Sequence, residues 1–424
     1  MQVIKRDGRK VEFHKDKIKE AVLKAFNEVY PNADKDNIND ANYVCKEVCN
    51  SIDKLNEISV EQIQDVVENI LMGYDTVVAK AYITYRYRHT MARDEYKALM
   101  ADVKEKLSAE NVQNQNANVD EYSFGGRIGE TADIVMKRYA LDYCMSDMAK
   151  KNHLNNEIYI HDLSHYAVGD HNCLSIPFDD LLANGFNTRQ TDVRPAQSVS
   201  TAFQLVAVIF QLQSLQQFGG VSATHLDWTM IPYVRKSFYK HYIDGLKYIE
   251  NVNDYGEMSD DDISDTSIDE DFYKSYTKAY KYAMDMTTKE VYQAVEGLYH
   301  NLNTLQSRSG NQLPFTSINY GTCTLSEGRL VTKALLETSI KGIGKLHKTS
   351  IFPCGIFQCM KGVNRKKGDP NYDLFQLALK STAQRLYPNY ANVDWSGNKG
   401  YDINDPRTYF STMGKLICSP CKTY

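Results

Sequence analysis

The chain has 424 residues, its net charge at pH 7 is −5, and 24% of its residues are charged. A chain of this length can form about three domains with a large core. Its weak charge excludes a polybasic protein that binds nucleic acid or membrane surfaces. The longest apolar run, residues 205–210, is too short to cross a bilayer. We therefore expect no membrane partner and no nucleic-acid partner.

The cysteines and the first residues indicate the compartment. Nine cysteines in a chain of this length, without dense pairing, are typical of reduced thiols and not of a disulfide scaffold. The first residues, Met-Gln-Val-Ile-Lys-Arg-Asp, lack the apolar segment of a signal peptide. Both observations predict a cytoplasmic protein.

Residues 1–95 have the pattern of a small separate domain. Short strands are predicted at residues 2–4 and 11–13, because Asp7-Gly8 between them is a typical hairpin turn. Four cations surround this turn: Lys5, Arg6, Arg9 and Lys10. Cations and backbone amides that converge on one point can hold a polyphosphate, although a solvated basic turn has the same composition.

Helical periodicity follows the hairpin. Helices are predicted at residues 17–29, 40–49, 60–71 and 79–93. Ser59, with Gln62 three residues later, is a capping-box start for the third of them. Residues 96–135 are polar and are interpreted as a linker with an entry helix, after which one large α/β domain is predicted to begin with a helix at 132–151.

Two segments of the large domain carry unusual polar patterns. A long apolar helix begins near residue 197, and Gln197, Gln204 and Gln211 recur on one of its faces. Because an unpaired buried amide costs about 1–3 kcal/mol, this stripe needs a second copy of the helix or a bound nucleotide, unless it faces solvent. Residues 253–271 carry nine acidic residues and no basic residue, which predicts a solvated insertion.

Residues 159–173 are the densest in chemically active side chains. They include His161, Asp162, His165, Asp170, His171 and Cys173. A thiol among imidazoles can be a metal ligand, an activated or redox thiol, or a small buried residue. Because the stretch lacks a second close ligand pair such as Cys-x-x-Cys, we expect no metal site and favour a redox or radical thiol.

Residues 308–322 form a third informative stretch. A glycine turn at Gly310 leads into a predicted strand rich in Thr, Ser and Asn. Short hydroxyl and amide side chains at the end of a strand can form hydrogen bonds with a sugar or a phosphate. A further strand is predicted at residues 351–354.

The motifs VIKRDGR (residues 3–9), DKI (16–18) and AYITYR (81–86) resemble an ATP-cone in order and spacing. This is the regulatory nucleotide-binding module at the front of ribonucleotide reductases. The resemblance implies an allosteric switch that ATP turns on and dATP turns off. It also implies that four residues contact the base and the phosphates: Val3, Lys5, Arg6 and Lys17.

Five further motifs extend the resemblance to about residue 414: IHDL (160–163), NC (172–173), QSVST (197–201), GNQLPF (310–315) and KKGDPNYD (366–373). Together they are similar to the catalytic subunit of anaerobic, class III ribonucleoside-triphosphate reductases, which are glycyl radical enzymes. The implied fold is α/β. It comprises a small, mostly helical ATP-cone with an N-terminal β-hairpin (1–95), a linker (96–135) and an incomplete ten-stranded α/β barrel (136–424).

The resemblance also implies a radical mechanism. A C-terminal glycyl radical is passed to a cysteine on a finger loop, the thiyl takes the 3′-hydrogen of the ribose, and the 2′-hydroxyl leaves as water. A second cysteine, on a barrel strand, helps to deliver the reducing equivalents, and Cys173 matches it. The residues implied at the substrate are His161, Ser198, Ser200, Gly310, Gln312 and Thr316.

The implied partners are a ribonucleoside triphosphate, a radical-SAM activating enzyme, formate or a thioredoxin-like reductant, and a second copy of the chain in a homodimer. The effectors are ATP and dATP. The family also carries a C-terminal zinc site with four cysteines, for which this sequence shows no counterpart. The glutamine-striped helix is the candidate dimer contact.

The sequence departs from the family at its end. The family's finger loop reads Met-Gly-Cys-Arg, whereas here Met413-Gly414 is followed by Lys415. Cys421, within Cys418-Ser419-Pro420-Cys421, is either the displaced radical cysteine or part of an unrelated tail. Because no glycyl radical segment is found, we expect an N-terminal fragment that reduces no ribonucleotide alone. The rivals are a non-catalytic ATP/dATP sensor and a glycyl radical lyase, which would lack the cone.

Overall fold

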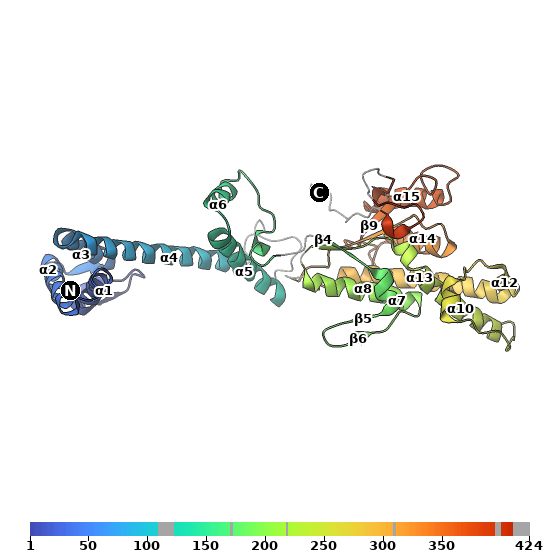
Figure 1. The fold of residues 1–424 in the computed structure, drawn as a ribbon, viewed down its shortest axis with the longest axis horizontal. Coiled ribbons are helices and arrows are strands. Elements are labelled where there is room, and N and C mark those ends of the chain that lie inside the picture. Colours follow the sequence, from blue (N-terminus) through green and yellow to red (C-terminus); the bar gives the residue numbers. More distant parts are fainter. Residues whose placement is uncertain (109–122, 170–172, 218, 308–310, 395–399, 410–424) are drawn as a thin grey trace. The chain divides into compact units, whose positions relative to one another are not determined.

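The computed structural model describes residues 1–108, 123–169, 173–217, 219–307, 311–394 and 400–409. The chain divides into two compact units, Met1–Glu105 and Lys106–Tyr424 (Figure 1). Among the described helices, none has both the length and the apolar composition that a bilayer-spanning segment requires.

A three-stranded sheet opens the first unit. Its strands are β1 (Gln2–Ile4), β2 (Lys10–Glu12) and β3 (Glu57–Ser59), in the order β2-β1-β3. The predicted hairpin is confirmed: β1 and β2 are antiparallel, and Gly8 in their turn has φ +82°, a conformation that glycine adopts at no steric cost. The sequence pattern did not predict β3, which pairs in parallel with β1.

Four helices complete this unit: α1 (Lys15–Val29), α2 (Asp34–Ile52), α3 (Val60–Tyr74) and α4 (Thr76–Ser108). The capping box is confirmed, since the Ser59 hydroxyl accepts from the Gln62 amide at 3.1 Å and the Gln62 side chain accepts from the Ser59 amide. Apolar faces of α1, α2 and α3 meet around fully buried Val22, Val44 and Leu71. Helix α4 continues beyond its predicted end into the expected linker, because residues 94–108 contain neither glycine nor proline.

The second unit begins with helices where one helix was predicted at residues 132–151. Helix α5 (Phe124–Tyr139) passes into a π-helical turn (Ala140–Cys144), and α6 (Asp147–Leu154) follows. The break falls at Met145, whose backbone is extended. Ser146 then begins a new helix, because its hydroxyl accepts from the Ala149 amide at 3.2 Å.

A five-stranded, fully parallel sheet forms the centre of the second unit. Its strands are β4 (Cys173–Ile176), β7 (Gly220–Ala223), β8 (Thr316–Tyr320), β9 (Cys354–Cys359) and β10 (Asn389–Asn392). Their spatial order, β10-β9-β8-β7-β4, follows the chain order without reversal. Strands β5 (Phe186–Asn187) and β6 (Asp192–Val193) form a separate antiparallel ribbon.

The strands alternate with helices. These are α7 (Phe178–Asn184), α8 (Val199–Gln216), α9 (Leu226–Thr229), α10 (Ile231–Tyr248), α11 (Asp260–Asp265), α12 (Asp271–Lys274), α13 (Thr277–Thr304), α14 (Ser326–Lys341) and α15 (Tyr372–Arg385). Crossovers between parallel strands are right-handed, and the strand order of this sheet never reverses. The crossover helices therefore cover one face of the sheet. These helices are α8, α13, α14 and α15, and each contacts the next. In the described ranges the sheet has five strands. The expected α/β class is therefore confirmed as a parallel sheet with helices, and the ten-stranded barrel stays a prediction.

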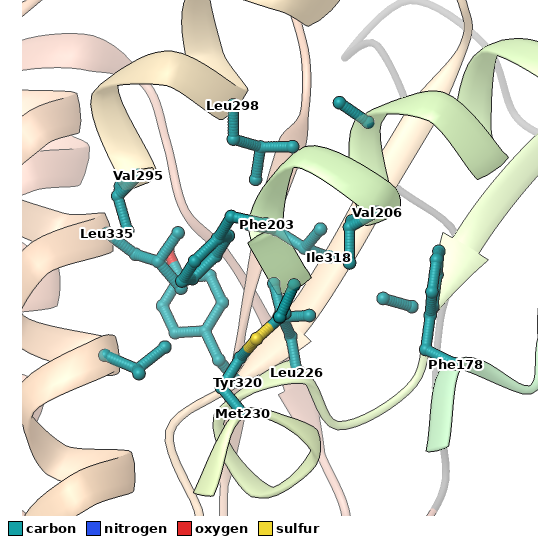
Figure 2. Close-up of a cluster of buried hydrophobic side chains, with 14 of the residues drawn as sticks. Phe178, Phe203, Val206, Leu226, Met230, Val295, Leu298, Ile318, Tyr320 and Leu335 are labelled. Carbon is teal, nitrogen blue, oxygen red and sulfur yellow. The ribbon is translucent and has the colours of Figure 1, made fainter. Parts of the chain in front are cut away.

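The largest apolar core fills the space between this sheet and its helices. Figure 2 shows Phe203 of α8, Leu298 of α13 and Leu335 of α14 around Ile318 and Tyr320 of β8. All five side chains are at most 1% exposed. Burial of a side chain of this size contributes about 1.5–3 kcal/mol, which is why β8 is fixed in the middle of the sheet.

The acidic segment 253–271 is more ordered than the predicted solvated insertion. It contains α11 and the start of α12, and Ile263 and Ile268 on it are buried. Ile268 belongs to a cluster with Phe238 and Tyr273. The carboxylates thus lie on the outside of a segment that apolar contacts anchor.

A buried carboxylate fixes the turn that follows β8. Asp227 is 0% exposed, and its Oδ2 accepts from the amides of Gly321 at 2.8 Å and Cys323 at 3.0 Å. Burial raises the pKa of Asp227, and these amide hydrogen bonds oppose that rise. On the other side of the turn, Asn371 donates to the carbonyls of Gly321 and Cys323. The turn is therefore held through both its donors and its acceptors.

We expect Asp227→Ala to destabilise the protein by about 3 kcal/mol, because two buried amides lose their acceptor at about 1–3 kcal/mol each. Urea unfolding of the 424-residue chain measures the loss. The exposed Asp265→Ala serves as control and should change stability by less than about 0.5 kcal/mol. Equal small effects of both substitutions would show that Asp227 does not support the turn.

Candidate functional site

A cavity of about 170 Å³ lies in the first unit between the hairpin, α1, α3 and α4. Three of the four predicted effector contacts, Val3, Lys5 and Lys17, line it. The remaining lining residues are Val11, Glu12, Phe13, His14, Ile18, Ala21, Val60, Ile63, Gln64, Val67 and Tyr82. Apolar walls with two lysines at the rim can hold a flat ring and a polyphosphate in one place.

The fourth predicted contact, Arg6, points elsewhere. Its guanidinium forms an ion pair with Glu61 and donates to the Gln64 side chain at 2.8 Å. Arg6 is not among the residues that line the cavity, whereas Gln64 is. The Arg6 guanidinium therefore borders the cavity through Gln64 and does not open into it.

Strand register separates the side chains of the large sheet onto two faces. Val221 pairs with Thr316 and Ala223 with Ile318, and Val221, Ala223 and Ile318 belong to the helix-covered core. Successive side chains of a strand alternate between faces. The residues at the alternate positions of β4, β7 and β8 therefore lie on the opposite face, which we call the polar face. They are Cys173, Ser175, Ser222, Ser317 and Asn319.

Three serines of the polar face form one row across neighbouring strands. Ser175 pairs with Ser222, and Ser222 pairs with Ser317. With a strand spacing of about 4.8 Å, the row spans about 10 Å, and Cys173 lies about 7 Å before it along β4. Asn319 donates to the Ser222 hydroxyl at 3.1 Å. Ser222, Ser317 and Asn319 are buried, whereas Cys173 and Ser175 are exposed. The accessible part of the polar face therefore lies along β4.

Cys173 is exposed at the first position of β4, the edge strand among the described residues. The sequence led us to expect a thiol enclosed in a barrel. The described residues do not enclose the thiol, because β4 has a described neighbour on one side only, β7. Strand β7 also separates it from β8, so Cys173 and Thr316 are in the same sheet but not on adjacent strands.

Thr316 lies on the helix-covered face, and its buried hydroxyl has no hydrogen-bond partner. Gln312, four residues earlier, is 8% exposed. Gly310 lies outside the described residues, as does Cys421 with the whole predicted finger-loop tail. Of the predicted strand, Ser317 and Asn319 share a face with Cys173, and Thr316 does not.

Ser198 and Ser200 lie at the start of α8. Ser198 caps the helix by accepting from the Thr201 amide at 3.2 Å, and Ser200 donates to Glu290 at 2.9 Å. Cys173 pairs with Gly220, just beyond the other end of α8. Because a helix of this length spans about 27 Å, the structure does not bring Ser198 and Ser200 together with Cys173.

His161, the last predicted substrate contact, is on the surface. His161 is paired with Asp162 at 2.6 Å, and its side chain is 72% exposed. Asp170 and His171 lie outside the described residues. In the glutamine stripe, Gln197 and Gln204 are exposed and Gln211 is partly buried. Among the described residues, no group of three or more His, Cys, Asp or Glu is placed to hold a metal ion.

Sequence reasoning missed a polar cluster at the carboxyl ends of β4 and β7. His225 donates to Asp179 at 2.7 Å, and Thr229 donates to the other oxygen of Asp179 at 2.6 Å. These residues line a cavity of about 260 Å³. The missed signal is positional: Asp179 and His225 each follow a strand by two or three residues, which is where ligands meet parallel sheets.

Similarity to known proteins agrees with this arrangement of a cavity-bearing helical domain before a parallel α/β unit. Residues 115–414 match the family "anaerobic ribonucleoside-triphosphate reductase", and residues 1–91 match the ATP cone domain. The chain is 33% identical over 401 residues to the anaerobic ribonucleoside-triphosphate reductase of Haemophilus influenzae, covering 92% of this chain and 52% of that protein. The Escherichia coli enzyme is 33% identical over 399 residues, covering 92% of this chain and 51% of the relative.

The chain spans about half the length of these curated relatives. Among solved structures it is similar to the anaerobic ribonucleotide reductase from Thermotoga maritima in complex with dATP and CTP. That similarity has 14% identity and a TM-score of 0.45, and covers 71% of this chain and 50% of the other.

The fold is a parallel α/β unit preceded by a small, mostly helical domain with a three-stranded sheet. The chain belongs to the anaerobic ribonucleoside-triphosphate reductase family, with an ATP cone domain at its amino end.

The Asp179–His225 pair predicts acid sensitivity. Burial opposes ionisation of Asp179, but the hydrogen bonds from His225 and Thr229 outweigh it and lower the pKa of this carboxyl. A lowered pKa contributes stability above the unfolded value, about 3.9, and that contribution is lost as the pH falls through the folded value. We expect the melting temperature of Asp179→Asn to fall less than that of the wild type between about pH 5 and pH 3.

The neighbouring Asp180→Asn is the matched control, since it removes a carboxylate from the same turn of α7. Parallel thermal melts over this pH range compare the three proteins. Identical acid dependence of wild type and Asp179→Asn would contradict the assignment of this stability to Asp179.

Proposed function

We propose that this chain provides the effector-binding domain and one substrate-facing sheet of an enzyme that reduces ribonucleoside triphosphates to deoxyribonucleoside triphosphates without oxygen. The observation that carries the proposal is the occurrence, in one chain, of an ATP cone and of the reductase family match over residues 115–414. The cation-lined cavity and the thiol on the polar face support it chemically.

In the first unit, Lys5 and Lys17 would neutralise the phosphates of the effector, and the apolar wall around Ile18 and Tyr82 would pack against its base. ATP would activate the enzyme, and dATP would inhibit it. Tyr82 and Ile18 are buried, at 6% and 7% exposure, so this wall exists before any nucleotide binds.

In the second unit, we propose that the five-stranded sheet is one half of a ten-stranded barrel. A sheet wound in one direction, with its crossover helices on one face, supports this, because such sheets close into barrels with the helices outside. The polar face would then line the interior. Cys173, exposed in the described structure, would face the space in which the ribose is held.

The polar face suits this chemistry in three respects. The Cys173 thiol can give up hydrogen and electrons to a reacting sugar, which is the role we propose for it in the loss of the 2′-hydroxyl as water. Ser175, exposed two residues after Cys173 on the same face, can accept hydrogen bonds from sugar hydroxyls or donate to them. A glycyl radical would supply the unpaired electron, and an activating enzyme of the radical-SAM type would generate it.

The proposal includes further partners. Formate or a thioredoxin-like protein would restore the reduced state, and a second copy of the chain would bind along α8, where Gln197 and Gln204 are exposed. Substrate contacts at His161, Ser198, Ser200, Gly310, Gln312 and Thr316 stay predictions. The geometry favours Ser175 as an addition, because it is exposed on the same strand and the same face as Cys173.

Nucleotide binding tests the effector site. We expect the 424-residue chain to bind ATP and dATP in calorimetric titrations, and Lys17→Gln to weaken both about tenfold, because a charged hydrogen bond to phosphate contributes about 1.5–3 kcal/mol. Lys24→Gln is the matched control: Lys24 is exposed on the same helix and does not line the cavity.

Failure of the wild-type chain to bind either nucleotide would contradict the effector site. The lyase alternative is already excluded by the ATP cone and reductase family matches. The Cys173→Ser variant distinguishes the proposed reductase from a regulatory sensor without catalysis. A pure sensor needs no thiol at this position, so the variant would keep every nucleotide-dependent property.

A further inference from the structure

The cations near the cavity of the first unit fall into two groups. Arg9 is paired with Asp7 at 2.6 Å, Lys10 with Glu57 at 2.5 Å, and Arg6 with Glu61. Arg86 of α4 is likewise paired with carboxylates, at 2.6 and 2.8 Å. The cavity-lining cations are therefore Lys5 and Lys17.

Arg6 differs from the other paired cations in its second partner, the Gln64 side chain. While its Nε is bound to Glu61, its Nη2 donates to Gln64, and Gln64 lines the cavity. Glu61 and Gln64 are three residues apart on α3 and therefore lie on the same side of that helix. The Gln64 side chain therefore connects the Arg6 guanidinium to the lining of the cavity.

Glu61 is well suited to hold this arginine while the site is empty. Partial burial opposes its ionisation, but its own backbone amide and Arg6 lower the pKa of the Glu61 carboxyl overall. It also lies in the first turn of α3, where the helix dipole favours negative charge. The carboxylate is therefore a stable anion placed next to a site for anions.

We propose that Glu61 is a built-in competitor of the nucleotide for Arg6: it holds the guanidinium in the empty state and releases it to a phosphate when the nucleotide binds. This inference rests on the proposed effector function of the cone. It makes Glu61, a residue outside the cavity lining, a determinant of effector affinity.

The exchange is favourable on physical grounds. The side chains of Arg6 and Glu61 are 34% and 47% exposed, and an ion pair this exposed is weak. A phosphate offers the guanidinium a bidentate, more highly charged partner. The competition should therefore lower affinity for the nucleotide modestly and should never block binding.

Substituting Glu61 tests the proposal on the 424-residue chain, with ATP titrated in a calorimeter at low salt. We expect Glu61→Gln to bind ATP about two- to fivefold more tightly than wild type, the range that corresponds to a surface ion pair. Glu57→Gln is the matched control, because it breaks the close ion pair between Glu57 of β3 and Lys10 and leaves Arg6 untouched. We expect this variant to bind ATP with the affinity of the wild type.

An Arg6→Gln background separates competition from simple repulsion between Glu61 and phosphate. If Glu61 acts through Arg6, adding Glu61→Gln to Arg6→Gln gives no further gain, whereas repulsion would give the same gain with or without the arginine. Raising the salt should narrow the difference between wild type and Glu61→Gln, since screening weakens the exposed pair.

Unchanged or weaker ATP binding by Glu61→Gln would overturn the inference, as would a gain that persists without Arg6. Absence of ATP binding by the wild type is a different result, because it would refute the effector site itself. Melting temperatures of the variants identify any loss of affinity that comes from unfolding.

Discussion

Parallel pairing in unbroken chain order is the constraint on which the second unit depends. Because β4, β7, β8, β9 and β10 follow one another without reversal, every crossover helix falls on the same side, and the core between them contains Phe203, Leu298 and Tyr320. The other side of the sheet is then free to be polar. The register that aligns Ser175, Ser222 and Ser317 in one row also places Cys173 at its edge.

The first unit solves a separate electrostatic problem. A site for a polyphosphate needs cations, but unpaired cations close together repel one another when the site is empty. Here acidic side chains from the turn, β3 and α3 pair with four cations, whereas Lys5 and Lys17 line the cavity. The paired cations are Arg6, Arg9, Lys10 and Arg86. The Arg6–Glu61 pair is the one that we propose to exchange with a nucleotide phosphate.

Local signals in the sequence predicted local structure well. The turn at Asp7-Gly8, the capping box at Ser59 and the position of β8 each depend on residues within a few positions of one another, and each is confirmed. The motif of the cone also located Val3, Lys5 and Lys17, which converge on one cavity. Short β3 was missed because three residues carry too little periodicity to be recognised.

Features that depend on distant pairing could not be predicted. The assignment of Thr316 to one face and Ser317 to the other follows from the register with β7, nearly a hundred residues away, and not from the strand's own composition. The same holds for Asp227, an ordinary aspartate in sequence whose burial is decided by the turn after β8. Ser198 and Ser200 were grouped with Cys173 by motif order, whereas the length of α8 separates them.

The central claim is that the polar face which begins at Cys173 is where a ribonucleoside triphosphate is held. Cys173 and Cys144 are both exposed thiols, which makes them a natural pair for comparison. The direct measurement is the rate of alkylation at each cysteine, followed by peptide mass mapping, with and without a ribonucleoside triphosphate. The account predicts that the nucleotide slows alkylation of Cys173 and leaves Cys144 unchanged; equal rates at Cys173 with and without nucleotide would contradict it.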